Sequence, residues 1–89
     1  MNSSVKVQFS DYAMLAHLFI ELRGKGLSLS AADLDILKSW ELSGIKAEFI
    51  ANVMHEYAEE CKQKSKNFPN SLLPVYRKVH AILLKSSEY

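Results

Sequence analysis

The sequence has little of the material that builds disulfide frameworks or membrane spans. Its single cysteine, Cys61, excludes a disulfide within the chain and gives no reason to expect an oxidising compartment. No run of roughly 18 or more apolar residues is present, so no transmembrane helix is expected. The opening MNSSVKVQFSDY lacks the basic-then-apolar order of a signal peptide. These absences together predict a cytoplasmic protein.

Glycine and proline are also scarce, with three glycines and two prolines in 89 residues. They fall near the ends of predicted helices, so they form no glycine-rich loop that would cradle a phosphate. Hydrophobic residues make up 48% of the chain and charged residues 24%, which is typical of globular proteins. A chain of this length has room for one domain with a modest core.

The residues that usually carry catalysis or metal binding do not occur at a telling spacing. His17, His55 and His80 fall on three different predicted helices. His55 and Cys61 are six positions apart and therefore point to different faces of one helix. No nucleophile with a base and no catalytic pair of carboxylates is evident. The sequence predicts no enzyme, no metal site and no cofactor.

Four helices are predicted, over residues 11–23, 31–43, 47–61 or beyond, and 72–84. The second has the clearest boundaries. Ser30 is the expected N-cap, and Asp33, three positions on, is a short-armed capping-box partner. Gly44 is the expected C-terminal stop, because glycine enters the left-handed conformation at little cost. Pro74 belongs in the first turn of the last helix, where its missing N–H is not needed.

Apolar residues recur at helical spacing along all four segments and predict a shared core. The positions expected to face inward are Leu15, Leu18, Phe19, Leu22, Leu34, Leu37, Trp40, Ile50, Val53, Met54, Tyr57, Ala58, Cys61, Leu72, Val75, Tyr76, Val79, Ile82 and Leu83. The connection after Gly44 is very short, which favours a hairpin of the second and third helices. The predicted fold is an all-α, compact four-helix domain with a central helical hairpin. It covers residues 10–85, with an N-terminal arm at 1–9 and a frayed tail at 86–89.

The N-terminal arm has a strand-like pattern. Val5, Val7 and Phe9 alternate with polar residues, as on a half-buried strand. A lone strand is not stable, so this arm either lies on the helices or pairs with another chain. These three residues are therefore the predicted contact to a protein partner or to a second copy.

Charge is divided unevenly along the chain. Residues 1–60 carry five basic and nine acidic groups, a balance of −4, whereas residues 61–89 carry six basic groups and Glu88, a balance of +5. A basic end on an acidic body can mark a surface that faces phosphates, or it can serve solubility alone. The predicted phosphate contacts are Lys62, Lys64, Lys66, Arg77 and Lys78.

The order LSLSAADLDILKSWELSGIKAEFIANVMHEYAEE, followed by a basic turn and FPNSLLPVYRKVHAIL, resembles the C-terminal domain of DnaD-like replication and phage proteins. The matching positions lie within residues 26–84 and are Leu27, Ser28, Trp40, Ile50, Val53, Met54, Leu72, Leu73 and Val79. The resemblance implies a final helix that positions the chain on a partner or on single-stranded DNA. The family's downstream Trp is missing here, and Ser71-Leu72-Leu73-Pro74 replaces its usual aromatic-Ile start.

The charge division and the resemblance together predict a small non-enzymatic binding module. It would act as a DNA-associated accessory protein of replication or of a mobile element and would contact phosphates through its basic C-terminal region. The alternative is a protein–protein interaction or homodimerisation module that binds no nucleic acid. Concentration-dependent association would favour the alternative.

Overall fold

The computed structural model describes residues 11–24, 26 and 28–86 of the chain. These residues form four helices and no strand: α1 (Asp11–Arg23), α2 (Ala31–Ser43), α3 (Ala47–Gln63) and α4 (Leu73–Ser86). The predicted all-α, four-helix domain is therefore confirmed. None of the described helices is both long enough and apolar enough to cross a membrane.

The two ends of α2 follow the signals in the sequence. The Ser30 hydroxyl accepts a hydrogen bond from the Asp33 amide at 3.1 Å, and the Asp33 carboxylate accepts one from the Ser30 amide at 3.4 Å. This is the predicted capping box. At the other end Gly44 adopts a left-handed conformation with a φ of 71°. The amides of Gly44 and Ile45 then bond back to the carbonyls of Glu41 and Trp40, which closes a Schellman motif.

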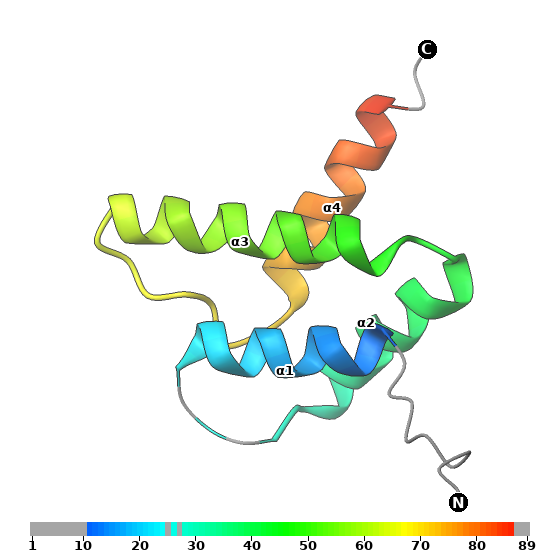
Figure 1. Ribbon diagram of the computed structural model, residues 1–89, viewed down its shortest axis with the longest axis horizontal. Coiled ribbons are helices and arrows are strands. Elements are labelled where there is room, and N and C mark those ends of the chain that lie inside the picture. Colours follow the sequence, from blue (N-terminus) through cyan, green and yellow to red (C-terminus); the bar gives the residue numbers. More distant parts are fainter. Residues whose placement is uncertain (1–10, 25, 27, 87–89) are drawn as a thin grey trace, which may run out of the picture.

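The helices are arranged differently from the predicted hairpin. α1 and α3 lie side by side and run in the same direction, while α4 packs against α3 and α2 packs against α1 and α4 (Figure 1). Although only Gly44–Lys46 separate α2 from α3, the two backbones diverge from this turn and do not pack along each other. The central hairpin was therefore a wrong prediction. The turn is instead held by the start of α1, where the Tyr12 hydroxyl donates a hydrogen bond to the Ile45 carbonyl.

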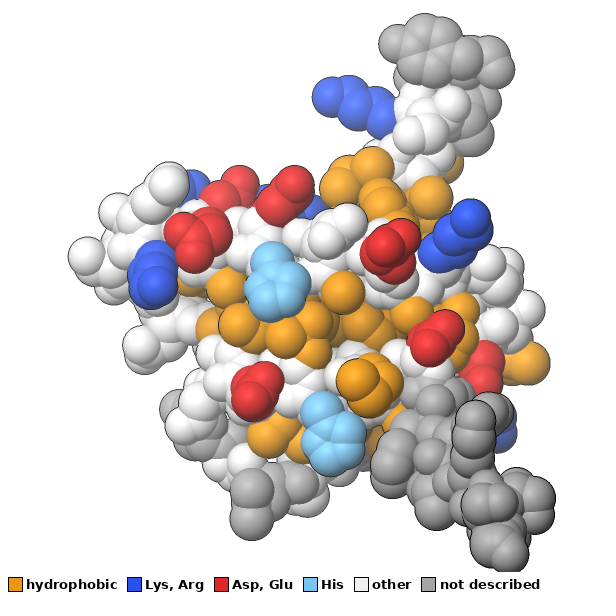
Figure 2. Space-filling model, in the orientation of Figure 1, with side chains coloured by type: hydrophobic (Ala, Val, Ile, Leu, Met, Phe, Trp, Pro, Cys, Tyr) orange, Lys and Arg blue, Asp and Glu red, His pale blue; other side chains and the backbone are white. Residues whose placement is uncertain are grey.

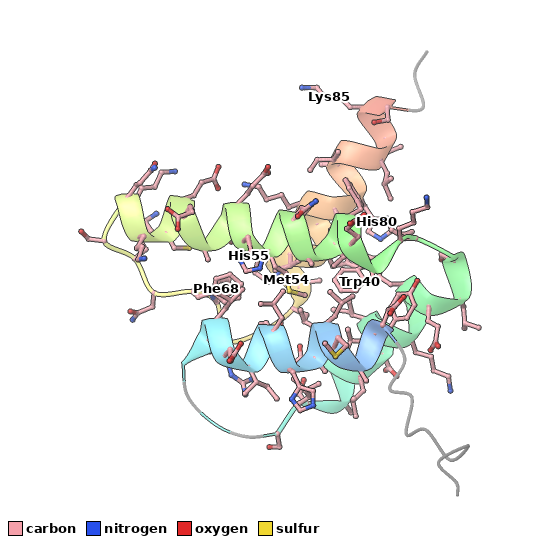
Figure 3. The ribbon with its side chains drawn as sticks, viewed as in Figure 1. Trp40, Met54, His55, Phe68, His80 and Lys85 are labelled. Atoms are coloured by element: carbon pink, nitrogen blue, oxygen red, sulfur yellow. The ribbon has the colours of Figure 1, made fainter. Side chains whose placement is uncertain are left out.

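Most positions predicted to face inward do form the core. Its fully buried side chains include Trp40, Phe19, Ile50, Met54 and Val79, contributed by all four helices. Trp40 and Met54 lie between the helices in Figure 3.

The exception is Leu34, which was predicted on the inner stripe of α2. It is 53% exposed, whereas its neighbour Asp33 is only 2% exposed. α2 therefore turns its capping carboxylate inward at the place where the sequence pattern favoured a leucine.

Asp33 is buried because it satisfies backbone groups from two distant parts of the chain. Besides its capping bond to Ser30, its carboxylate accepts a hydrogen bond from the Leu72 amide at 2.9 Å, in a buried position. Leu72 is the last residue before α4, and its side chain is fully buried. The hydroxyl of Ser71 beside it accepts a hydrogen bond from the Leu73 amide at 3.0 Å, so it satisfies the first amide of α4. One carboxylate thus joins the beginning of α2 to the beginning of α4.

The connection from α3 to α4 is anchored to the core by Phe68. This side chain is 8% exposed and packs against the rings of Phe19 and Tyr57, with centroids 6.0 and 5.6 Å away. Figure 3 shows Phe68 below α3, next to the end of α1. The connection is therefore tied to the core at its middle.

Two polar atoms of the core have no hydrogen-bond partner among the described residues. They are Nε1 of Trp40 and Nε2 of His80. Trp40 is fully buried, as its place among the inward-facing positions predicted. The two rings are linked through Tyr76, whose centroid lies 6.2 Å from that of Trp40 and 4.1 Å from that of His80.

Candidate nucleic-acid interface

Four of the five predicted phosphate contacts surround one pocket. Lys64 and Lys66 come from the connection after α3, and Arg77 and Lys78 come from the second turn of α4. The pocket has a volume of about 520 Å³, and its other walls are formed by Tyr57, Glu60, Cys61, Asn67, Pro69 and Pro74. Residues that are more than ten positions apart in the sequence therefore converge on one hollow. We call these four side chains the basic cluster.

The end of α3 places the lysines of the cluster. Ser65 adopts a left-handed conformation with a φ of 55°. The Ser65 amide bonds to the Lys62 carbonyl, and the Lys66 amide bonds to the Cys61 carbonyl at 2.7 Å, the pattern of a Schellman motif. The chain turns back sharply here and brings Lys66 to the rim of the pocket that Lys64 also lines. This turn has no glycine, and the sequence therefore gave no signal for it.

One acidic residue lies inside the basic cluster. Nζ of Lys78 is 2.6 Å from Oε1 of Glu60, and both side chains are partly exposed. The hydrogen bond and charge of Lys78 lower the pKa of the Glu60 carboxyl below its usual value of 4.5, with a further contribution from Lys64. Nζ of Lys78 also lies 5.1 Å from the centre of the Tyr57 ring, a cation–π contact. Counting four positive groups and one negative group, the pocket carries a net charge of +3.

Lys62 stands apart from the basic cluster. It is the penultimate residue of α3 and lines a second hollow of about 420 Å³, on the side of α3 that faces α1. Arg23, Glu21 and Glu59 line that hollow as well. Lys66 borders both hollows. Glu21 and Glu59 oppose Arg23, Lys62 and Lys66 in this hollow, so it carries a net charge of +1, against +3 for the pocket of the basic cluster.

The other predicted contacts and the histidines lie elsewhere. Val5, Val7 and Phe9 fall outside the described residues, so the proposed pairing arm stays a prediction. His17 and His55 are exposed on α1 and α3, and His80 is half-buried on α4. Within the part of the chain that the structure describes, no three or more histidine, cysteine, aspartate or glutamate side chains gather closely enough to hold a metal ion.

Sequence reasoning missed two members of the site. Glu60 was not among the predicted site residues, and it pairs with Lys78 across the pocket. Tyr57 was predicted only to face inward, and its ring also contacts the ammonium group of Lys78. Both contacts form because α4 packs against α3. The spacing of residues within either helix does not predict how the two helices pack.

Comparison with known proteins finds no matching family model, no similar curated protein and no similar solved structure.

Proposed function

We propose that this chain is a non-enzymatic binding module that holds the phosphate backbone of DNA against its basic cluster. The observation that supports the proposal is the meeting of Lys64, Lys66, Arg77 and Lys78 around one pocket. Lysine and arginine side chains neutralise phosphates and release condensed counterions, and this supplies affinity without reading the sequence. A role in replication or in a mobile element follows from the resemblance to DnaD-like domains and stays a prediction.

The arrangement favours backbone contact over base reading. The cluster is formed by a helix end, a turn and the first half of α4, so no helix presents a row of side chains to a major groove. The exposed cations come from two elements that face each other across the pocket. Such a geometry suits a strand of phosphates passing between them.

The test is fluorescence anisotropy with labelled single- and double-stranded oligonucleotides at several salt concentrations. If four phosphates are neutralised, the slope of log K against log[salt] should be about −3 for single strands and about −3.6 for duplexes. Lys64→Glu and Arg77→Glu should each weaken binding at least about tenfold at low salt, because each reversal turns an attraction into a repulsion.

Two lysines outside the pocket provide matched controls. Lys38→Glu alters net charge by the same amount, and Lys38 is an exposed residue of α2 that does not line the pocket. It should weaken binding much less. Lys62→Glu should have an intermediate effect, because Lys62 lies on the other side of α3. Equal losses in all four variants, or no binding at low salt, would contradict the proposal.

A further inference from the structure

A second surface, unrelated to the basic cluster, lies along the seam of α1 and α3. Figure 2 shows a strip of hydrophobic side chains there, with acidic side chains on both sides of it. The strip includes a groove of about 400 Å³ with a floor of Met14, Leu15, Leu18, Ala47 and Ala51. We call this the α1–α3 groove. Met14 is 60% exposed, so the groove presents apolar surface to the solvent.

The groove carries negative charge at one end. Asp11 and Glu48 line it, and they belong to the first turns of α1 and α3. Since the two helices run in the same direction, both amino-terminal ends meet here (Figure 1). The groove therefore suits an apolar helix whose carboxyl-terminal end carries a cation. Its cation would meet the two carboxylates, and its dipole would oppose those of α1 and α3.

The chain itself carries a helix of this kind. The last turns of α4 project away from the rest of the described structure (Figure 1). Ala81 and Leu84 are exposed there, Leu84 by 68%, and Ile82 is half-buried. Lys85 follows in the last turn and points away from the body in Figure 3. The end of α4 thus combines apolar side chains with a terminal cation, the complement of the α1–α3 groove.

We propose that the end of α4 from one copy of this chain docks in the α1–α3 groove of a second copy. The docked helix lies antiparallel to α1 and α3, with Leu84 on the apolar floor and Lys85 beside Asp11 and Glu48. The contact uses about two helical turns, far less than the area of a permanent dimer, so the association is weak and concentration-dependent. This surface is independent of DNA, since it shares no residue with the basic cluster.

The test is sedimentation velocity on the full chain without nucleic acid, from about 20 µM to about 1 mM. The weight-average sedimentation coefficient should rise with concentration. Leu84→Glu should raise the dissociation constant at least about tenfold, because it places a carboxylate on an apolar floor beside two others. Leu42→Glu is the matched control, since Leu42 is 80% exposed on α2 and lines no part of the groove. It should leave the dissociation constant unchanged.

A charge exchange identifies the two surfaces that meet. Lys85→Glu and Glu48→Lys should each weaken self-association, by roughly threefold to tenfold. An equimolar mixture of the two variants should associate more strongly than either variant alone, because the unchanged Lys85 of one variant then meets the unchanged Asp11 and Glu48 of the other. A concentration-independent monomer at the highest concentration would overturn the proposal. So would a mixture no stronger than either variant alone, or equal effects of the Leu42 and Leu84 changes.

Discussion

Besides the core packing of α4, two carboxylates in very different surroundings bond to this helix and to the residue before it. Asp33 is 2% exposed and accepts backbone amides from Ser30 and Leu72. Glu60 is half exposed and accepts only the flexible ammonium of Lys78. The first supplies an acceptor to a buried backbone amide that water does not reach, while the second competes with water for a cation that is partly exposed. The Asp33 junction therefore determines stability, and the Glu60 junction adjusts the charge of a surface.

The largest effect is expected at the buried junction. Asp33→Ala removes the capping box and leaves the Leu72 amide buried without an acceptor, so it should lower the free energy of unfolding by about 2–4 kcal/mol. Urea denaturation followed by circular dichroism measures this. Asp35→Ala, an exposed neighbour on the same helix, should change it by no more than about 0.5 kcal/mol. Similar losses in the two variants would contradict the role of the buried bond.

The indole N–H of Trp40 is buried without a hydrogen-bond partner among the described residues, so its removal should cost little stability. Trp40→Phe removes the unpaired indole N–H together with part of the ring. The loss of packing and the relief of an unsatisfied donor oppose each other, so the free energy of unfolding should fall by about 1 kcal/mol or less. Trp40→Ala should cost about 3–5 kcal/mol in the same denaturation experiment. If Trp40→Phe costs as much as Asp33→Ala, the indole has an acceptor after all.

The turn beside the Glu60 junction can be stabilised. Ser65 occupies a left-handed position that glycine occupies at the end of α2. Ser65→Gly should therefore raise the free energy of unfolding by about 0.5–1 kcal/mol, because glycine adopts this φ without a steric penalty. Gly44→Ala should lower it by a similar amount, about 1 kcal/mol, at the equivalent position of the other Schellman motif. Changes of the same sign in the two variants would contradict this comparison.

The smallest effect on stability is expected at Glu60. Glu60→Gln should leave the thermal midpoint nearly unchanged at neutral pH, because an exposed ion pair contributes little. The same change frees Lys78, so affinity for DNA should rise, roughly twofold to fivefold at low salt. Glu56→Gln, which alters an exposed residue of α3 outside the pocket, is the control. A fall in affinity would contradict the account of the basic cluster.

The ion pair of Glu60 and Lys78 also determines the direction in which the stability of the fold changes with pH. Lys78 lowers the pKa of Glu60 in the folded protein, whereas the unfolded chain titrates near 4.5. The carboxylate therefore stabilises the fold above that value, and this small contribution is lost as the pH falls through the folded pKa. Thermal melts between neutral pH and about pH 3 should show slightly less acid sensitivity in Glu60→Gln than in the wild-type protein.

Local chemistry in the sequence was enough to predict the helices but not how they pack. Ser30, Asp33 and Gly44 determine the ends of α2 through bonds within a few residues. The angle between α2 and α3 depends on which other helices pack against each of them. α1 packs against α3, whereas α2 does not. The predicted hairpin failed because a short loop limits distance but not direction.

In the candidate site, too, some features follow from the sequence and others depend on how the helices pack. The sequence by itself determined that positive charge gathers in the last third of the chain, that four helices form, and that no disulfide can link them. Only the tertiary structure decided that Lys64 and Arg77 line one pocket while Lys62 lines the hollow between α3 and α1, because this depends on how α1 and α4 pack against α3. It also decided that Asp33 binds Leu72, 39 positions away. Hydrogen bonds within one turn are encoded by adjacent residues, whereas contacts across the fold depend on packing that no local pattern records.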